Sequence, residues 1–100
     1  MQVIALRDVR EDLLEGKQFY DSIELGVGDY FWDSIMGDIK SLVLYGGIHS
    51  HKHGLYRMPA KRFPYSIYYT VDQNRVHVIA VLPMRQDPQM IKEKLTERRW

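Results

Sequence analysis

The chain has 100 residues, of which 45% are hydrophobic and 27% are charged, and it contains no cysteine. This size and composition predict one small globular domain over residues 1–100 and argue against a coiled coil, a collagen-like chain or a fully disordered chain. The lack of cysteine excludes disulfides, thiolate metal sites and thiol catalysis. No apolar run approaches the roughly 20 residues of a membrane span and the chain opens with no signal-peptide pattern, so we expect a cytoplasmic protein without a membrane partner.

The net charge of +1 hides an uneven distribution along the chain. Residues 1–50 hold four basic and nine acidic residues, and residues 51–100 hold ten basic and four acidic ones, so the halves carry −5 and +6. A basic half predicts an anionic partner, either nucleic acid or an acidic protein segment. The alternative is a fold whose two layers attract each other, and charge alone favours neither.

The first half predicts a short strand followed by two helices. A β-type run covers Gln2–Leu6, and Asp8 is a suitable N-cap for a helix over about 9–23, whose apolar face includes Ile23. Two glycines break the pattern at 26 and 28, after which Asp29 is expected to cap a second helix that ends near residues 46–47.

The two helices should form an antiparallel hairpin because the connection between them is so short. The second helix carries an apolar stripe at helical spacing, which Val43 widens. This stripe consists of Phe31, Ile35, Ile39 and Leu42. Gly16 lies on or beside the apolar face of the first helix, where its missing side chain would let the second helix approach closely.

The second half changes to a strand-type pattern. Strands are predicted over 55–58, 63–71 and 75–82, with a turn at 72–74 that makes the last two an antiparallel hairpin. The strand 75–82 is apolar on both faces toward its end, which is typical of a central strand. Asp87 and Pro88 then form an N-cap and first position for a short terminal helix.

Three histidines, His49, His51 and His53, alternate in the segment before the first of these strands. In an extended backbone they would point the same way and could bind a divalent metal. No carboxylate lies between them to complete or orient such a site, so we predict no metal centre. A solvated loop is the alternative we prefer, and a nucleic-acid site in which His51 or His53 moves a proton is the third.

The candidate residues for binding an anionic target are basic and are interleaved with aromatic residues. They are Lys52, Arg57, Lys61, Arg62 and Arg85. Cations and aromatic rings on a sheet are typical of RNA-binding surfaces, although we expect Phe63 and Tyr68 to lie in the core instead. The sequence contains no phosphate-binding loop, dinucleotide-binding glycine run, paired acids of a hydrolase or nucleophile elbow, and we expect no cofactor.

Nearly the whole chain resembles the ParE branch of the RelE/ParE toxin superfamily. The most specific parts of the resemblance are Phe63-Pro64-Tyr65-Ser66-Ile67-Tyr68-Tyr69 and Arg85-Gln86-Asp87-Pro88. The resemblance implies an α+β fold in which an N-terminal strand and a helical hairpin pack on a twisted antiparallel sheet, with a short C-terminal helix. It also implies the toxin of a type II toxin–antitoxin or plasmid stabilisation system. Such a toxin is neutralised by a partly disordered cognate antitoxin and reaches operator DNA only through the antitoxin complex.

The resemblance leaves two targets open. RelE-like toxins are ribosome-dependent mRNA endonucleases, and in that case Arg85 with His51 and His53 would be the catalytic candidates. This chain, however, has no tyrosine after Tyr69 and no histidine after His77, and the family's His-Xaa-Arg-Arg reads Pro83-Met84-Arg85-Gln86. ParE-like toxins lack that catalytic set and poison DNA gyrase, so we rank gyrase first. A non-catalytic RNA-binding module is a further alternative.

The charge split adds a physical expectation about the antitoxin. A basic groove between sheet and helices would suit an acidic, amphipathic segment that folds on contact. We therefore expect Arg57, Arg62 and Arg85 to share one face and to be covered by that partner.

Overall fold

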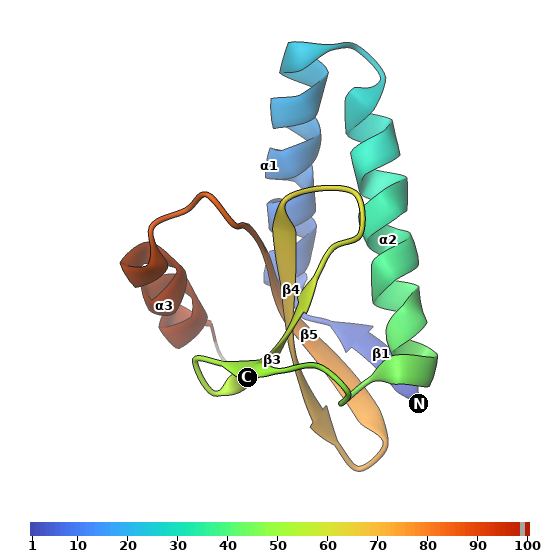
Figure 1. Ribbon diagram of the computed structural model, residues 1–100, viewed down its shortest axis with the longest axis vertical. Helices are drawn as coiled ribbons and strands as arrows, with labels where there is room; N and C mark the ends of the chain where they lie inside the picture. The colour runs from blue at the N-terminus through green and yellow to red at the C-terminus, as the bar shows by residue number, and fades with distance from the viewer. Residues whose placement is uncertain (99) are drawn as a thin grey trace.

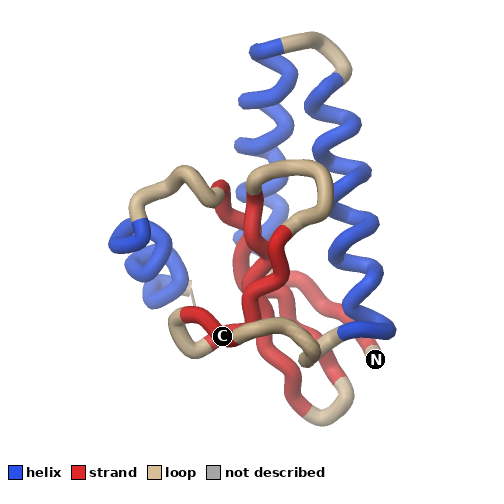
Figure 2. Tube along the Cα trace, in the orientation of Figure 1, coloured by secondary structure: helices blue, strands red, loops and turns tan. Residues whose placement is uncertain are grey.

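The computed structural model describes residues 1–98 and 100 and shows one sheet with helices on both of its faces (Figure 1). The strands are β1 (Gln2–Ala5), β2 (His51–Lys52), β3 (Leu55–Pro59), β4 (Tyr65–Asp72) and β5 (Arg75–Pro83). The helices are α1 (Arg7–Ile23), α2 (Val27–Tyr45) and α3 (Pro88–Glu97). Figure 2 shows α1 and α2 side by side on one side of the sheet and α3 on the other. The predicted α+β fold is confirmed.

The sheet has the strand order β1-β5-β4-β3-β2. Strands β2 to β5 are antiparallel, as predicted, whereas β1 pairs with β5 in parallel. Since α1 leaves β1 directly and the rest of the chain separates β1 from β5, no hairpin turn fixes their relative direction. The sheet is therefore mixed, and β5 is central between β1 and β4, as its two apolar faces predicted.

The two faces of the sheet carry separate hydrophobic clusters. The α1–α2 hairpin covers the larger one, which includes Phe31, Ile35, Leu42, Tyr65, Ile67, Tyr69, Val76, Val78 and Val81. α3 covers the smaller one, formed by Leu55, Tyr68, Ile79, Ala80, Leu82, Ile91 and Leu95. Tyr68 is thus a core residue, as expected, and Phe63 is partly buried against the larger cluster.

The hairpin packs closely because glycines face the neighbouring helix at two positions. A Cβ on Gly16 would overlap the ring of Phe31, and a Cβ on Gly28 would overlap the Lys17 carbonyl and the Asp21 carboxylate. The close approach predicted at Gly16 is confirmed. Of the two glycines in the connection, Gly26 takes a positive φ of 96°, whereas Gly28 is helical.

Both helices begin earlier than predicted, so neither Asp8 nor Asp29 is an N-cap. α1 begins at Arg7 because Leu6 ends β1 with a hydrogen bond to Val78 and takes the N-cap position. α2 begins at Val27 because Asp21 of α1 accepts hydrogen bonds from the N–H groups of Gly26 and Gly28. A carboxylate from the neighbouring helix therefore supplies the capping interaction.

Two residues assigned to apolar helix faces are exposed. Ile23 ends α1 beyond the sheet, and Val43 lies on the outer side of α2. Both follow the helical spacing, but the sheet does not extend far enough to cover them. Among the described residues, no helix combines the length and the apolar content that a membrane crossing requires.

The strands differ from the prediction at their ends. β4 begins at Tyr65 and not at 63, because the Tyr65 N–H bonds back to the Phe63 carbonyl in a turn. The turn at 72–74 places Gln73 and Asn74 at positive φ, as a two-residue hairpin loop requires. A two-residue strand, β2, was not predicted and pairs with the start of β3.

The helix α3 begins as predicted, with Asp87 accepting a hydrogen bond from the Gln89 N–H at 2.7 Å.

Candidate functional site

The residues predicted to bind a target are distributed over four parts of the fold. Lys52 lies on β2 and Arg57 on β3, while Lys61 and Arg62 lie in the loop between β3 and β4, and Arg85 lies in the loop between β5 and α3. All are exposed except Arg57, which is partly buried.

Only two of the three histidines lie together: the rings of His49 and His51 contact the stacked pair Tyr69 and Tyr56, whereas His53 lies beside α3. The Tyr69 hydroxyl accepts a hydrogen bond from the Gly47 N–H at 3.0 Å and lies 2.5 Å from Nδ1 of His49. The ring of His51 packs edge-on against Tyr56, and His53 has a positive φ of 57° that breaks the extended backbone. Over residues 1–98 and 100, no three His, Asp or Glu side chains cluster as metal ligands.

His53 and Arg85 lie on opposite sides of α3. His53 lines a recess with Lys92, Thr96 and Trp100, whereas Arg85 lines another recess with Lys94. Lys92 and Lys94 are two positions apart on the helix and so face nearly opposite directions. Burial, with the nearby charges of Lys52 and Lys92, lowers the pKa of His53. Burial also lowers the pKa of His49.

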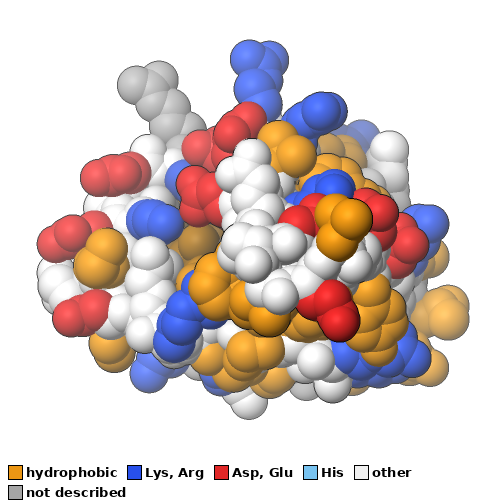
Figure 3. All heavy atoms as spheres, turned by 90° about the horizontal axis from the view of Figure 1, so that it is seen from above, with side chains coloured by type: hydrophobic (Ala, Val, Ile, Leu, Met, Phe, Trp, Pro, Cys, Tyr) orange, Lys and Arg blue, Asp and Glu red, His pale blue; other side chains and the backbone are white. Residues whose placement is uncertain are grey.

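Arg57 and Arg85 are associated with opposite faces of the sheet. Arg57 pairs across the sheet with Tyr68, a residue of the α3-side cluster, and its Nε donates to the Ser66 hydroxyl at 3.0 Å. The guanidinium carbon of Arg85 lies 4.4 Å from the centre of the Phe19 ring, on α1. The structure therefore does not gather the three arginines on one face. Seen from the hairpin end, basic, acidic and hydrophobic side chains are intermixed (Figure 3).

The recess at Arg85 has a volume of about 240 Å³ and lies between α1, the end of β5 and α3. Glu15 and Lys94 add charges to its wall, and Phe19 and Tyr65 add aromatic surface. Burial and the neighbouring Tyr20 raise the pKa of Tyr65, and Arg85 opposes that rise without cancelling it. The phenol is thus a neutral hydroxyl at physiological pH, next to an exposed cation. This combination was not predicted, because Tyr65 and Phe19 are far apart in sequence.

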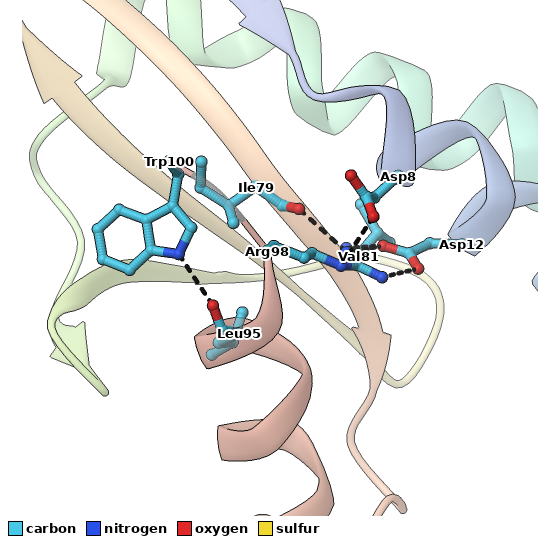
Figure 4. A network of polar contacts seen from close by, with 7 residues as sticks. All are labelled: Asp8, Asp12, Ile79, Val81, Leu95, Arg98 and Trp100. Atoms are coloured by element: carbon cyan, nitrogen blue, oxygen red, sulfur yellow. Dashed lines mark hydrogen bonds and ion pairs between the residues drawn. The ribbon is translucent and has the colours of Figure 1, made fainter.

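A buried ion pair closes the neighbouring part of the β5 edge (Figure 4). Both terminal nitrogens of Arg98 donate to the Asp12 carboxylate at 2.6 Å, and one also donates to the Ile79 carbonyl at 3.0 Å. Asp12 accepts a further hydrogen bond from the Val81 N–H at 2.9 Å. Two backbone groups of β5 beyond its pairing with β1, the Val81 N–H and the Ile79 carbonyl, are therefore satisfied by Asp12 and Arg98.

The Arg98 guanidinium keeps its charge in this partly buried position. Burial alone would lower the pKa of Arg98, but the hydrogen bonds and charge of Asp12, with smaller contributions from Asp8 and Glu15, outweigh it and raise the pKa. Sequence reasoning missed the pair, although Asp12 sits on the buried face of α1 beside Val9 and Leu13. An acid at that position was the available signal for a buried partner.

Comparison with solved structures finds chains of similar fold. No family model matches the sequence, and no curated protein matches it. A chain of a solved structure titled "Chromosomal ParDE TA system from P. aeruginosa" superposes with a TM-score of 0.76 at 16% sequence identity, covering 85% of this chain and 97% of that chain. The chain therefore has a ParE-like fold, consistent with the sequence resemblance.

Proposed function

We propose that this protein is the toxin of a toxin–antitoxin pair and that it inhibits DNA gyrase in the manner of ParE-like toxins. The observation that carries the proposal is the shared fold with a chain of a ParDE system over most of both chains. The Phe-Pro-Tyr and Arg-Gln-Asp-Pro segments of the sequence support the same assignment independently of the superposition.

The separation of the predicted catalytic residues supports gyrase over RNA as the target. Cutting an RNA backbone requires a proton donor or acceptor within hydrogen-bond reach of the reacting atoms. The candidates for that role, His51 and His53, lie on β2 and in the turn after it, and α3 separates His53 from Arg85. The indole N–H of Trp100, the last aromatic residue, is engaged with the Leu95 carbonyl at 2.9 Å.

The recess at Arg85 is the surface that we propose for target contact. It combines an exposed guanidinium with aromatic surface from Phe19 and Tyr65, a combination that is frequent at the energetic centres of protein interfaces. Lys52, Arg57, Lys61 and Arg62 remain candidate contact residues of lower rank, because they lie outside this recess.

The remaining elements of the proposal follow from the toxin assignment. The toxin acts in the cytoplasm and is neutralised by a cognate antitoxin, and it contacts operator DNA only through the antitoxin complex. A plasmid stabilisation role would follow where the pair is plasmid-borne.

Inducible expression of the chain in bacterial cells tests the proposal. We expect loss of colony formation together with double-strand breaks that carry covalently attached gyrase, while mRNA stays intact. Arg85→Ala should restore growth at equal protein level, whereas Arg75→Ala, at the exposed start of β5, should not.

Two results would contradict this proposal. Codon-phased mRNA cleavage on ribosomes with intact chromosomal DNA would establish the RNA endonuclease alternative. Normal growth at high expression of folded protein would remove the toxin assignment altogether.

A further inference from the structure

The two edges of the sheet differ in how they are protected against other chains. One edge is β2, which has only two residues, His51 and Lys52, and is followed by the positive φ of His53. The other edge is β1, Gln2–Ala5, which contains no charged residue, proline or glycine. Short length, a lysine and an irregular backbone are common protections of an edge strand against pairing with another chain. β1 is also short, but it lacks the other two.

The backbone on the outer side of β1 has free hydrogen-bonding groups. The N–H groups of Gln2 and Leu6 donate to carbonyls of β5 and of the turn before it, at 3.2 and 2.9 Å. Since the N–H and C=O of one residue point to the same side of a strand and those of the next residue to the other, Val3 and Ala5 direct theirs away from β5. β1 is the last strand of the sheet on this side (Figure 1), so no strand of the described chain receives them.

The side chains of β1 are apolar after Gln2 and are incompletely covered. Val3 is half-buried against the larger hydrophobic cluster, on the side of the α1–α2 hairpin. Ile4 points to the opposite face of the sheet and is 39% exposed, and Ala5 is exposed. An uncharged strand with apolar side chains and a free edge is a template for pairing with another strand.

The spacing of the free groups fits a second copy of the same strand. If two β1 strands lie antiparallel with the two Ile4 residues opposite each other, Val3 of each chain faces Ala5 of the other, and both pairs exchange N–H···O bonds in both directions. A one-residue shift would place Val3 opposite Ile4, whose backbone groups are directed toward β5. The paired strands bring no like charges together, and the two Ile4 side chains form a cross-strand pair on the α3 side.

We propose that β1 pairs antiparallel with β1 of a second copy of this chain, so that two five-stranded sheets join about a two-fold axis at Ile4. This contact uses the same surface on both copies and closes on itself, and the β2 edge is protected, so it gives a dimer and not a filament. β1 pairs with β5 only over Arg75–Val78, whereas the recess at Arg85 begins at Val81, so the dimer contact does not use the recess.

Sedimentation equilibrium of the purified chain tests the proposal. A pair of four-residue strands buries less area than a standard interface, so we expect a dimer with a Kd of about 10–100 μM. Ile4→Lys should weaken this dimer about tenfold or more, because the two-fold axis sets each new ammonium opposite its own copy. Ile4→Glu should weaken it for the same reason, and an equimolar mixture of the two variants should form a heterodimer.

Leu25→Lys is the matched control for the added charge. Leu25 is 91% exposed at the tip of the α1–α2 hairpin, which Figure 1 shows far from β1, so this variant should dimerise like the original chain.

Ala5→Pro tests the hydrogen bonds of the dimer separately from its side chains. It removes an N–H that no strand of this chain receives, so the fold should be retained, as is usual for a proline on the solvent side of an edge strand. The dimer should weaken about tenfold or more, because half of the hydrogen bonds between the two strands are lost. In the original chain, hydrogen exchange of the Val3 and Ala5 amides should slow as the protein concentration rises.

Three results would overturn the inference. The original chain could remain monomeric at concentrations up to about 1 mM. A dimer that Ile4→Lys leaves intact, or that Leu25→Lys dissociates, would place the interface elsewhere. Folded Ile4→Lys and Ile4→Glu variants that do not associate with each other would contradict the register around Ile4. All three are measured without a cellular target, so they leave the toxin assignment intact, and failure of the chain to arrest growth would leave the dimer intact.

Discussion

The two helical layers are attached to the sheet by different means. The α1–α2 hairpin buries a long apolar stripe, and Phe31, the first residue of that stripe on α2, packs against Tyr20, Phe63 and Tyr65 with ring centres 4.8 to 5.2 Å apart. The shorter α3 buries two apolar side chains, Ile91 and Leu95, and the segment after it is fastened by the Asp12–Arg98 pair.

The difference shows how a small chain secures both sides of one sheet. The large layer buries most of the apolar side chains, and each fully buried one contributes about 1.5–3 kcal/mol. The α3 layer buries little apolar area, and the two-point hydrogen bonding between Arg98 and Asp12 fixes its position on the sheet.

Phe31→Ala tests the hairpin side of this comparison and should have the largest effect. Phe31 is fully buried, and we expect the free energy of unfolding to fall by about 3–5 kcal/mol, measured by urea denaturation. Leu44→Ala, at an exposed position of the same helix, should change it by less than about 0.5 kcal/mol. Equal losses in the two variants would show that the hairpin is not held by its buried stripe.

Arg98→Met tests the α3 side. It leaves the buried Asp12 carboxylate without its cation, and we expect a loss of about 3 kcal/mol in the free energy of unfolding. Adding Asp12→Asn should recover part of this loss, because the double variant removes the unpaired charge and keeps an acceptor for Val81. Arg10→Met, at an exposed position of α1, is the control. A loss under about 0.5 kcal/mol for Arg98→Met would mean that apolar contacts alone secure α3.

Asp87→Ala removes the N-cap of α3 and so tests how much this cap stabilises the helix. We expect a loss of about 1 kcal/mol and lower helix content by circular dichroism, since the Gln89 N–H loses its acceptor. Gln89→Ala keeps that backbone N–H and should cost less. If both variants unfold like the original chain, the cap does not contribute to the attachment of α3.

His49 gives the smallest expected effect, and it concerns the loop that follows the hairpin. Its pKa is lowered in the folded protein by burial, so the unfolded chain binds the proton more tightly. The stabilising contribution is present above the unfolded pKa of about 6.5 and is lost as the pH falls through the folded pKa. His49→Gln should therefore reduce the loss of stability between pH 7 and 5, measured by thermal unfolding at each pH. An unchanged pH profile would contradict the assignment to His49, because His53, whose pKa is also lowered, would then account for the whole effect.

Local patterns were sufficient to predict the order of every element except the two-residue strand β2, and also the central position of β5, the Asp87 cap and the glycine contact at Gly16. Each of these four features depends on the spacing of apolar residues within a short segment or on a strong turn signal. The starts of α1 and α2 were missed because Val78 and Asp21, which set them, lie on other elements.

The candidate site was harder to predict than the fold. Arg57 lies on β3 and Arg85 follows β5, the two strands that flank β4, but Arg57 faces the α3 side of the sheet whereas Arg85 lies over Phe19 of α1. The Arg85 recess joins Phe19 and Tyr65, and the Asp12–Arg98 pair spans 86 residues, so neither has a short-range sequence signal.

A gyrase cleavage assay with purified components tests the proposed toxicity most directly. The protein is incubated with gyrase, ATP and supercoiled plasmid, and linear DNA is measured after detergent and protease treatment. The account predicts linear plasmid that increases with the amount of protein and falls to background for Arg85→Ala. Background levels of linear DNA at a large molar excess of folded protein would contradict it.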